Sequence, residues 1–215
     1  MIDLGRLRSN LESVRGRIAA ACGRSRRDSG SVTLIVVTKS IPKELIPRLA
    51  DFGVTDIGEN RAAEGADRVA GLSGFRKHMI GHLQTNKAVR ALQWADLVHS
   101  VDRPSLIREL AKHQRKVPIF VQLNVSGEGS KGGFSPEEAD GAVADARRTL
   151  DVVGLMTMAP EGADARPHFR RLRELAMRAG LEKLSMGMTQ DFEVAVEEGA
   201  THVRVGTAIF EGVIV

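Results

Sequence analysis

The chain has 215 residues, of which 42% are hydrophobic and 27% are charged, a composition typical of a soluble globular protein. Its formal net charge of +4 permits an anionic ligand but does not require a nucleic acid partner. The single cysteine, Cys22, excludes an internal disulfide framework and fits a reducing compartment. No apolar stretch approaches a membrane span, and the N-terminus lacks a signal-peptide pattern. We therefore expect a cytoplasmic protein without membrane contacts.

The N-terminal residues show the apolar spacing of an amphipathic helix. Apolar side chains recur at steps of three and four, at Leu4, Leu7, Leu11, Val14 and Ile18. This pattern predicts a helix within residues 1–22. We expect the helix to pack across one end of the domain.

From Val32 onward, strand-like runs alternate with helix-like segments. The runs cover residues 32–38, 55–59, 77–82, 97–101, 118–125, 152–158, 183–188 and 202–207. Helix-like segments include 44–52 and 104–114, and Ser135 with Glu138 forms a capping-box signature. Strict β–α alternation predicts a parallel sheet, and eight such units predict a closed (β/α)₈ TIM barrel of the α/β class. An open doubly wound sheet is the alternative.

The sequence shows no internal repeat, low-complexity tract or linker. We therefore expect one domain over residues 1–215, with the N-terminal helix in 1–22 and the barrel in 32–210. A monomer is the default expectation, because no interface pattern is visible.

Lys39 closes the first strand, whose residues are apolar and mostly β-branched, as in strands buried in a parallel sheet. Active sites in such barrels lie at the C-terminal ends of the strands. A lysine there is expected to be poorly hydrated, which favours the neutral amine that forms Schiff bases with aldehydes. The alternative is a lysine that only ends a strand and points to water.

The last two strands end in segments suited to an anion. These are Ser185-Met186-Gly187-Met188 and Arg204-Val205-Gly206-Thr207. Glycines let backbone N–H groups approach a phosphate, and the hydroxyls of Ser185 and Thr207 add donors. Arg204 shares a strand face with Gly206 and needs a partner if buried. The partner is either an acid such as Glu59 or a ligand heteroatom.

Three other patterns are weaker signals. Residues 127–132 match G-x-G-x-x-G, but no helix follows directly and no acid ends the next strand, so a glycine-rich loop is favoured, in which Lys131 is a candidate anion contact. His78 and His82 are four residues apart, but no third ligand lies nearby, so we expect no metal. His82, at a strand end, is the better candidate for a polar ligand contact.

A basic helix is predicted around Arg170, Arg171 and Arg173, and its arginines are interpreted as a solvated face. The chain has one tryptophan, seven phenylalanines and no tyrosine, so a platform for stacking bases is poorly supported. We expect no nucleic acid partner, although a nucleic-acid-binding module remains an alternative hypothesis.

Taken together, these residues resemble the pyridoxal-phosphate homeostasis protein family, relatives of the alanine racemase barrel. The matching stretches are Val37-Thr38-Lys39, Ile57-Gly58-Glu59-Asn60, the segment from Ile80 to Lys87, His99-Ser100-Val101-Asp102, Asn124-Val125-Ser126, Lys131-Gly132-Gly133-Phe134, Gly154-Leu155-Met156-Thr157-Met158, Leu184-Ser185-Met186-Gly187-Met188, and Arg204 to Phe210. They occur in family order over nearly the whole chain.

The resemblance implies that the cofactor is pyridoxal 5'-phosphate (PLP) and assigns roles to individual residues. Lys39 would hold PLP as a Schiff base, Arg204 would face the pyridine nitrogen, and Asn60 would contact the side of the ring. Ser185, Met186, Gly206 and Thr207 would bind the phosphate. No catalytic residue and no metal ligand are expected.

Two features differ from a racemase of this lineage. Such racemases use a tyrosine as the second base, and this sequence has none; they also carry a second β domain, whereas this chain ends eight residues after Thr207. An arginine at the pyridine nitrogen keeps its proton, so the ring is a weaker electron sink. After Phe210, Glu211 stands where the family usually has glycine.

The expected function is therefore a non-catalytic role in PLP homeostasis. The protein would hold PLP reversibly and pass it to PLP-dependent apo-enzymes. An amino-acid racemase of low activity is the alternative.

Overall fold

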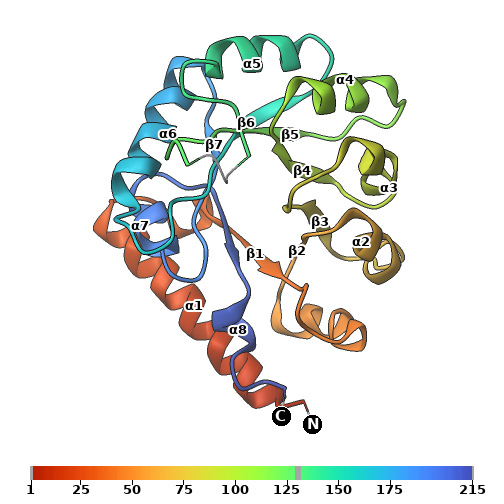
Figure 1. Ribbon diagram of the computed structural model, residues 1–215. Coiled ribbons are helices and arrows are strands. Elements are labelled where there is room, and N and C mark those ends of the chain that lie inside the picture. Colours follow the sequence, from red (N-terminus) through yellow and green to blue (C-terminus); the bar gives the residue numbers. More distant parts are fainter. Residues whose placement is uncertain (1, 129–131, 215) are drawn as a thin grey trace.

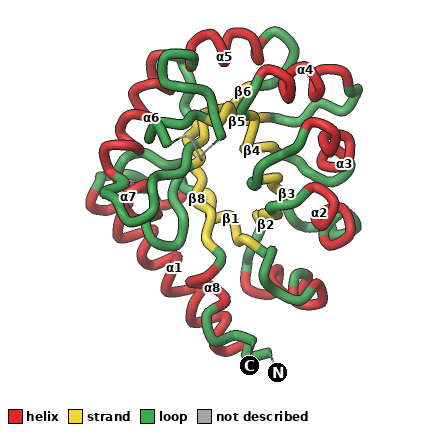
Figure 2. The backbone as a smooth tube through the Cα atoms, in the orientation of Figure 1, coloured by secondary structure: helices red, strands yellow, loops and turns green. Residues whose placement is uncertain are grey.

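The computed structural model describes residues 2–128 and 132–214 as a closed parallel barrel. The eight strands pair in chain order, and β8 pairs with β1 to close the sheet. Figure 2 shows them as a central ring surrounded by helices. The strands are β1 (Thr33–Val37), β2 (Asp56–Glu59), β3 (Arg76–Met79), β4 (Leu97–Val101), β5 (Ile119–Gln122), β6 (Val152–Met156), β7 (Lys183–Ser185) and β8 (His202–Val205). The predicted (β/α)₈ barrel is confirmed, and the open-sheet alternative is wrong.

Helices follow the strands and form the outer layer (Figure 1). Their apolar residues pack against the outer face of the barrel, as Phe169 and Leu172 of α6 do with no exposed surface. The helices are α2 (Ala62–Arg68), α3 (Ala88–Leu92), α4 (Pro104–Lys112), α5 (Ala139–Arg147), α6 (Arg166–Arg178), α7 (Phe192–Glu197) and α8 (Thr207–Phe210). Short 3₁₀ helices are η1 (Ser29–Ser31), η2 (Lys43–Leu45), η3 (Pro47–Phe52) and η4 (Thr85–Lys87).

The segment after β1 differs from its prediction as one helix over 44–52. It forms the two 3₁₀ helices η2 and η3. Pro47 begins η3, and because proline lacks a backbone N–H it cannot donate the bond that would continue a helix from η2. The predicted capping box is present, since Ser135 N donates to Glu138 Oε2 at 2.8 Å and Glu138 N donates to Ser135 Oγ at 3.2 Å.

The N-terminal helix α1 (Leu4–Arg24) buries Leu7, Leu11, Val14 and Ile18, as its spacing predicts. It lies alongside α7 and α8 in the outer layer, rather than across one end of the barrel (Figure 1). The physical reason is that α8 has only four residues and leaves apolar surface that α1 covers. Ile2 pairs with Ile214 in an antiparallel bridge, so the two ends of the described chain lie together. No helix within residues 2–128 and 132–214 has the length and hydropathy that crossing a membrane requires.

Candidate functional site

Lys39 lies just beyond the end of β1, on a turn that other side chains hold in place. Thr38 is buried and donates from Oγ1 to Glu59 Oε1 at 2.7 Å. Arg68 donates from Nη2 to the carbonyl oxygens of Thr38 and Ile41, both at 2.7 Å. The Lys39 residue itself is exposed. The expectation of a poorly hydrated lysine is therefore wrong, because the side chain leaves the sheet at the barrel mouth instead of entering its core.

Asn60 follows β2 at the same end of the barrel. The residue is half-buried, yet its Oδ1 atom is fully buried and has no hydrogen-bond partner among the described residues. A buried acceptor without a partner is costly, so Asn60 offers an unused acceptor to a ligand with a polar hydrogen. Its predicted contact with the side of the ligand ring remains a prediction.

Arg204 lies inside the barrel on β8 and is almost completely buried. Its Nη1 donates to Ser185 Oγ at 2.7 Å, and its Nη2 donates to the Thr157 carbonyl oxygen at 3.1 Å. Burial lowers the pKa of Arg204 to about 10, so the guanidinium remains protonated at neutral pH. The alternative of an ion pair with Glu59 is wrong, because Glu59 pairs with Arg68 at 3.0 Å.

The predicted phosphate residues divide into two pairs. Gly206 is half-buried and Thr207 is exposed, whereas Ser185 and Met186 have no exposed surface. The Ser185 hydroxyl bonds to Arg204 and to His99 Nδ1 at 2.7 Å, and Met186 N donates to the His202 carbonyl oxygen at 3.1 Å. These contacts engage the Ser185 hydroxyl and the Met186 N–H, whereas Gly206 and Thr207 have exposed surface. Phosphate binding by the four residues remains a prediction.

The sequence analysis missed a polar cluster in the barrel interior. His78 and His99 have no exposed surface, and His202 is 5% exposed. His99 stacks on Phe120 with ring centroids 4.4 Å apart. Burial lowers the pKa of His99 well below its ordinary value, and the charges of His78 and His202 lower it further. Burial also lowers the pKa of His202 to about 3. The alternation of strand side chains was the available signal, since it directs all three imidazoles inward.

His78 belongs to this cluster, whereas His82 lies apart from it. It bonds to Asp56 and His99 inside the barrel, while His82 lies at the mouth with its side chain 62% exposed and bonds to Asp102 Oδ2 at 3.0 Å. The two histidines therefore do not face a common ion. The part of the chain that the structure describes contains no group of three or more His, Cys, Asp or Glu side chains suited to a metal.

The glycine-rich loop after β5 is described only in part. Asn124 bridges its first residues, accepting from Gly127 N at 3.1 Å and donating to the Glu128 carbonyl oxygen at 2.8 Å. On the far side, Gln122 Nε2 donates to the Gly132 carbonyl oxygen at 2.7 Å. Lys131, the candidate anion contact, lies outside the described residues.

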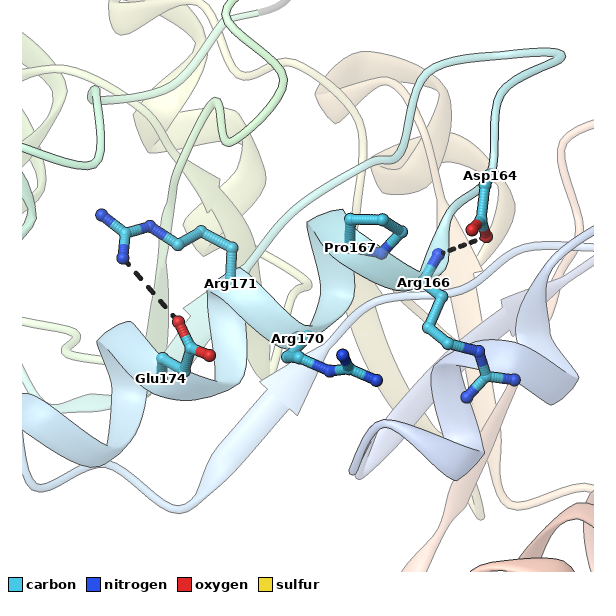
Figure 3. A pocket seen from close by; sticks show the side chains of 6 residues that line it. All are labelled: Asp164, Arg166, Pro167, Arg170, Arg171 and Glu174. Atoms are coloured by element: carbon cyan, nitrogen blue, oxygen red, sulfur yellow. Dashed lines mark hydrogen bonds and ion pairs between the residues drawn. The ribbon is translucent and has the colours of Figure 1, made fainter.

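The arginines of α6 face acids instead of forming a purely solvated surface. Figure 3 shows a pocket along this helix, lined by Asp164, Arg166, Pro167, Arg170, Arg171 and Glu174. Glu198, at the end of α7, pairs with Arg166 at 2.9 Å and with Arg170 and Arg173 at 3.2 Å each. These pairs reduce the positive field that a nucleic acid would need.

The fold and the site define a class: (β/α)₈ barrels with a lysine at the end of the first strand and a buried arginine in the last. The family model described as "Alanine racemase, N-terminal domain" matches residues 2–212. The pyridoxal phosphate homeostasis protein of Aquifex aeolicus is 38% identical, covering 93% of this chain and 95% of that protein. The chain therefore belongs to the alanine racemase N-terminal domain family and, within it, to the pyridoxal phosphate homeostasis proteins.

Two solved structures are similar over nearly their whole length. An unknown protein from Bifidobacterium adolescentis superposes with a TM-score of 0.86 at 32% identity, and the match covers 98% of each chain. PipY of Synechococcus elongatus, solved with PLP bound, superposes with a TM-score of 0.79 at 30% identity, covering 95% of this chain and 99% of PipY.

Proposed function

We propose that this protein binds PLP at the barrel mouth, with Lys39 as the covalent anchor, and that it takes part in PLP homeostasis without catalytic turnover of its own. The observation that carries the proposal is the Lys39 amine, exposed on a fixed turn at the end of β1. PipY, of similar fold, has been solved with PLP bound. When bound, PLP supplies an aldehyde that condenses with a primary amine with loss of one water, and water reverses the step.

The residues around Lys39 fit such a ligand. Asn60 offers a buried acceptor without a partner, and Arg204 offers a protonated donor inside the barrel. At Gly206, a Cβ atom would lie 3.2 Å from both the Cβ and the carbonyl oxygen of Val37, so a side chain would crowd the end of β1. We assign ring contacts to Asn60 and Arg204 and phosphate contacts to Gly206 and Thr207. Ser185 and Met186 are buried beneath these contacts, and Ser185 Oγ accepts a hydrogen bond from Arg204.

Two features support binding without turnover. The sequence contains no tyrosine, so the second base that a racemase of this lineage uses is absent from it. Arg204 has a pKa of about 10 and donates without releasing its proton at neutral pH, which leaves the pyridine ring a weaker electron sink. The protein acts as a monomeric cytoplasmic reservoir that delivers PLP to apo-enzymes.

The test is the visible spectrum of the purified protein with PLP, compared with Lys39→Ala and Lys43→Ala. Lys43 is an exposed lysine on the next 3₁₀ helix and serves as the matched control. We expect a yellow band in the wild type and in Lys43→Ala, bleached by borohydride and missing in Lys39→Ala. A band that persists in Lys39→Ala overturns the anchor.

A second measurement tests the absence of turnover. The PLP-loaded protein is incubated with L-alanine in deuterated buffer, and the α-proton is followed by NMR. We expect no exchange above that of free PLP. Exchange that requires Lys39 would instead establish the racemase alternative.

A further inference from the structure

A continuous series of hydrogen bonds runs through the barrel interior from Arg204 to Asp56. Arg204 Nη1 lies 2.7 Å from Ser185 Oγ, which lies 2.7 Å from His99 Nδ1. His99 Nε2 then lies 2.9 Å from His78 Nδ1, and His78 Nε2 lies 2.9 Å from Asp56 Oδ1. All five side chains are buried. Of these five residues, the proposed function assigns a ligand contact only to Arg204.

When each imidazole carries one proton, the carboxylate end of the series fixes the direction of every bond. A guanidinium can only donate and a carboxylate can only accept. Ser185 Oγ therefore accepts from Arg204 and donates to His99 Nδ1. His99 Nε2 donates to His78 Nδ1, and His78 Nε2 donates to Asp56. In the opposite direction Ser185 would accept from both Arg204 and His99, and its own hydrogen would need a further acceptor.

The series connects the two ends of the barrel, and it joins the positive charge of Arg204 to the negative charge of Asp56. Arg204 and Ser185 lie toward the mouth, whereas Asp56 begins β2 and lines an opening at the other end with Thr55, Gly74, Phe75, Arg76 and Asp96. Burial raises the pKa of Asp56, but hydrogen bonds from His78 and Thr55 outweigh burial and lower it overall. The Asp56 carboxylate is therefore charged at neutral pH.

The guanidinium of Arg204 bonds to Ser185 and to the Thr157 carbonyl oxygen, and the nearby charge of Asp191 raises its pKa less than burial lowers it, so its charge is only partly compensated. Charges near the series are those of Arg76, Lys183 and Asp56 around His202, and that of Asp191 near Arg204. A buried charge without compensation is costly. A chain of aligned hydrogen bonds in a medium of low dielectric constant transmits polarisation from one end to the other.

We propose that Asp56 is a second, remote counter-charge of Arg204 in addition to Asp191, and that Ser185, His99 and His78 are positioning residues that orient the guanidinium and transmit the charge of Asp56 to it. The link to the cofactor rests on the proposed function, in which Arg204 faces the pyridine ring. The hydrogen-bond relay itself is a property of the free protein and does not depend on PLP.

The first test uses the cofactor-free protein labelled with ¹⁵N-histidine. We expect His78 and His99 each to carry one proton, on Nε2, with Nδ1 as acceptor. Ser185→Ala should change the Nδ1 shift of His99. A proton on Nδ1 of either ring in the wild type overturns the relay, whether or not the protein binds PLP.

The second test compares Asp56→Asn with Asp96→Asn. Both acids line the same opening, but Asp96 bonds to Lys77 N and Arg115 and lies outside the relay. We expect Asp56→Asn to weaken PLP binding about tenfold, equivalent to about 1.4 kcal/mol, and to shift the visible band, with His99→Gln acting similarly. Asp96→Asn should change neither.

The outcomes separate the two proposals. A wild type that fails to bind PLP overturns the proposed function and leaves the NMR test of the relay intact. A wild type that binds PLP while Asp56→Asn and Asp96→Asn behave alike overturns the remote counter-charge.

Discussion

Arg68 Nη2 donates to the carbonyl oxygen of Thr38 at 2.7 Å, so a side chain of α2 holds the backbone directly before Lys39. The same guanidinium pairs with Glu59, whose side chain is only 1% exposed. One residue thus joins the ends of β1 and β2 at the barrel mouth. This contact explains how the backbone at Lys39 is held in place although the Lys39 side chain is exposed.

We predict that Arg68→Met destabilises the protein by about 3 kcal/mol, because it leaves the buried carboxylate of Glu59 without its cation. Urea denaturation monitored by circular dichroism measures this change. The matched control is Arg61→Met, which removes a pair with Glu64 whose side chains are 77% and 43% exposed and should cost less than about 1 kcal/mol. Equal losses in the two variants would contradict the role of Arg68.

Glu198 provides a second prediction, concerning acid sensitivity. Burial raises its pKa, but hydrogen bonds from Arg170 and Arg166 and the charge of Arg173 outweigh burial and lower it. A carboxylate whose pKa is lowered in the folded state stabilises the protein above its unfolded pKa, and this stability is lost as the pH falls through the folded pKa.

We therefore expect Glu198→Gln to reduce the free energy of unfolding by about 2 kcal/mol at neutral pH and by clearly less in acid. Glu174→Gln on α6 is the control, since Glu174 is 56% exposed and lies 3.7 Å from Arg171. Urea denaturation of both variants at neutral and at acid pH measures these losses in the free energy of unfolding. A loss that is independent of pH would show that packing, and not charge, is the contribution of Glu198.

The strands could be predicted from the sequence because buried parallel strands are continuous apolar runs. All eight predicted runs overlap an observed strand. Several predictions extended too far at the C-terminal end: residues 123–125 and 186–188 are mostly apolar, but they lie outside β5 and β7, and Gly187 has φ +95°. The apolar pattern of the strand continues past its last paired residue, so the pattern alone does not mark where pairing stops.

The site could be predicted only as a set of positions. Lys39 and Asn60 were predicted at strand ends and Arg204 within the last strand. The structure has Lys39 and Asn60 just after β1 and β2 and Arg204 within β8, and contact of all three with one ligand remains a prediction. The hydrogen bonds of Ser185 could not be predicted, since strand alternation indicates on which face of the sheet a side chain lies but not how deeply it is buried. Its partner His99 is 86 residues away in the chain, and Arg68 is 30 residues from Thr38. Such pairs depend on how the barrel packs residues that are distant in the chain.

His202 gives a third prediction. Its pKa in the folded protein is about 3, against an ordinary value of 6.5, so in this pH window the unfolded chain binds a proton that the folded chain does not. Stability therefore rises with pH across the window, by about 1.4 kcal/mol per pH unit for one such histidine. Replacing His202 with Gln should reduce the slope of unfolding free energy against pH by that amount. An unchanged slope would assign the acid sensitivity to other groups.

The last prediction concerns the turn after β7. Gly187 has φ +95°, and a Cβ atom there would lie 2.6 Å from the Cβ of Ala195, so both the backbone conformation and the packing require glycine. We expect Gly187→Ala to lower the free energy of unfolding by about 2 kcal/mol. Because Arg204 N donates to the Gly187 carbonyl oxygen at 3.0 Å, we also expect PLP binding to weaken.

Gly141 is the matched control for this substitution. It lies on the exposed face of α5, and a Cβ atom there would meet nothing within 4 Å. Alanine is the better helix former, so Gly141→Ala should stabilise the protein by about 0.5–1 kcal/mol and leave PLP binding unchanged. Thermal unfolding and PLP titration of both variants measure the two effects. If Gly187→Ala matched Gly141→Ala in sign, the turn after β7 would tolerate a side chain, and its close contact with α7 would have to relax.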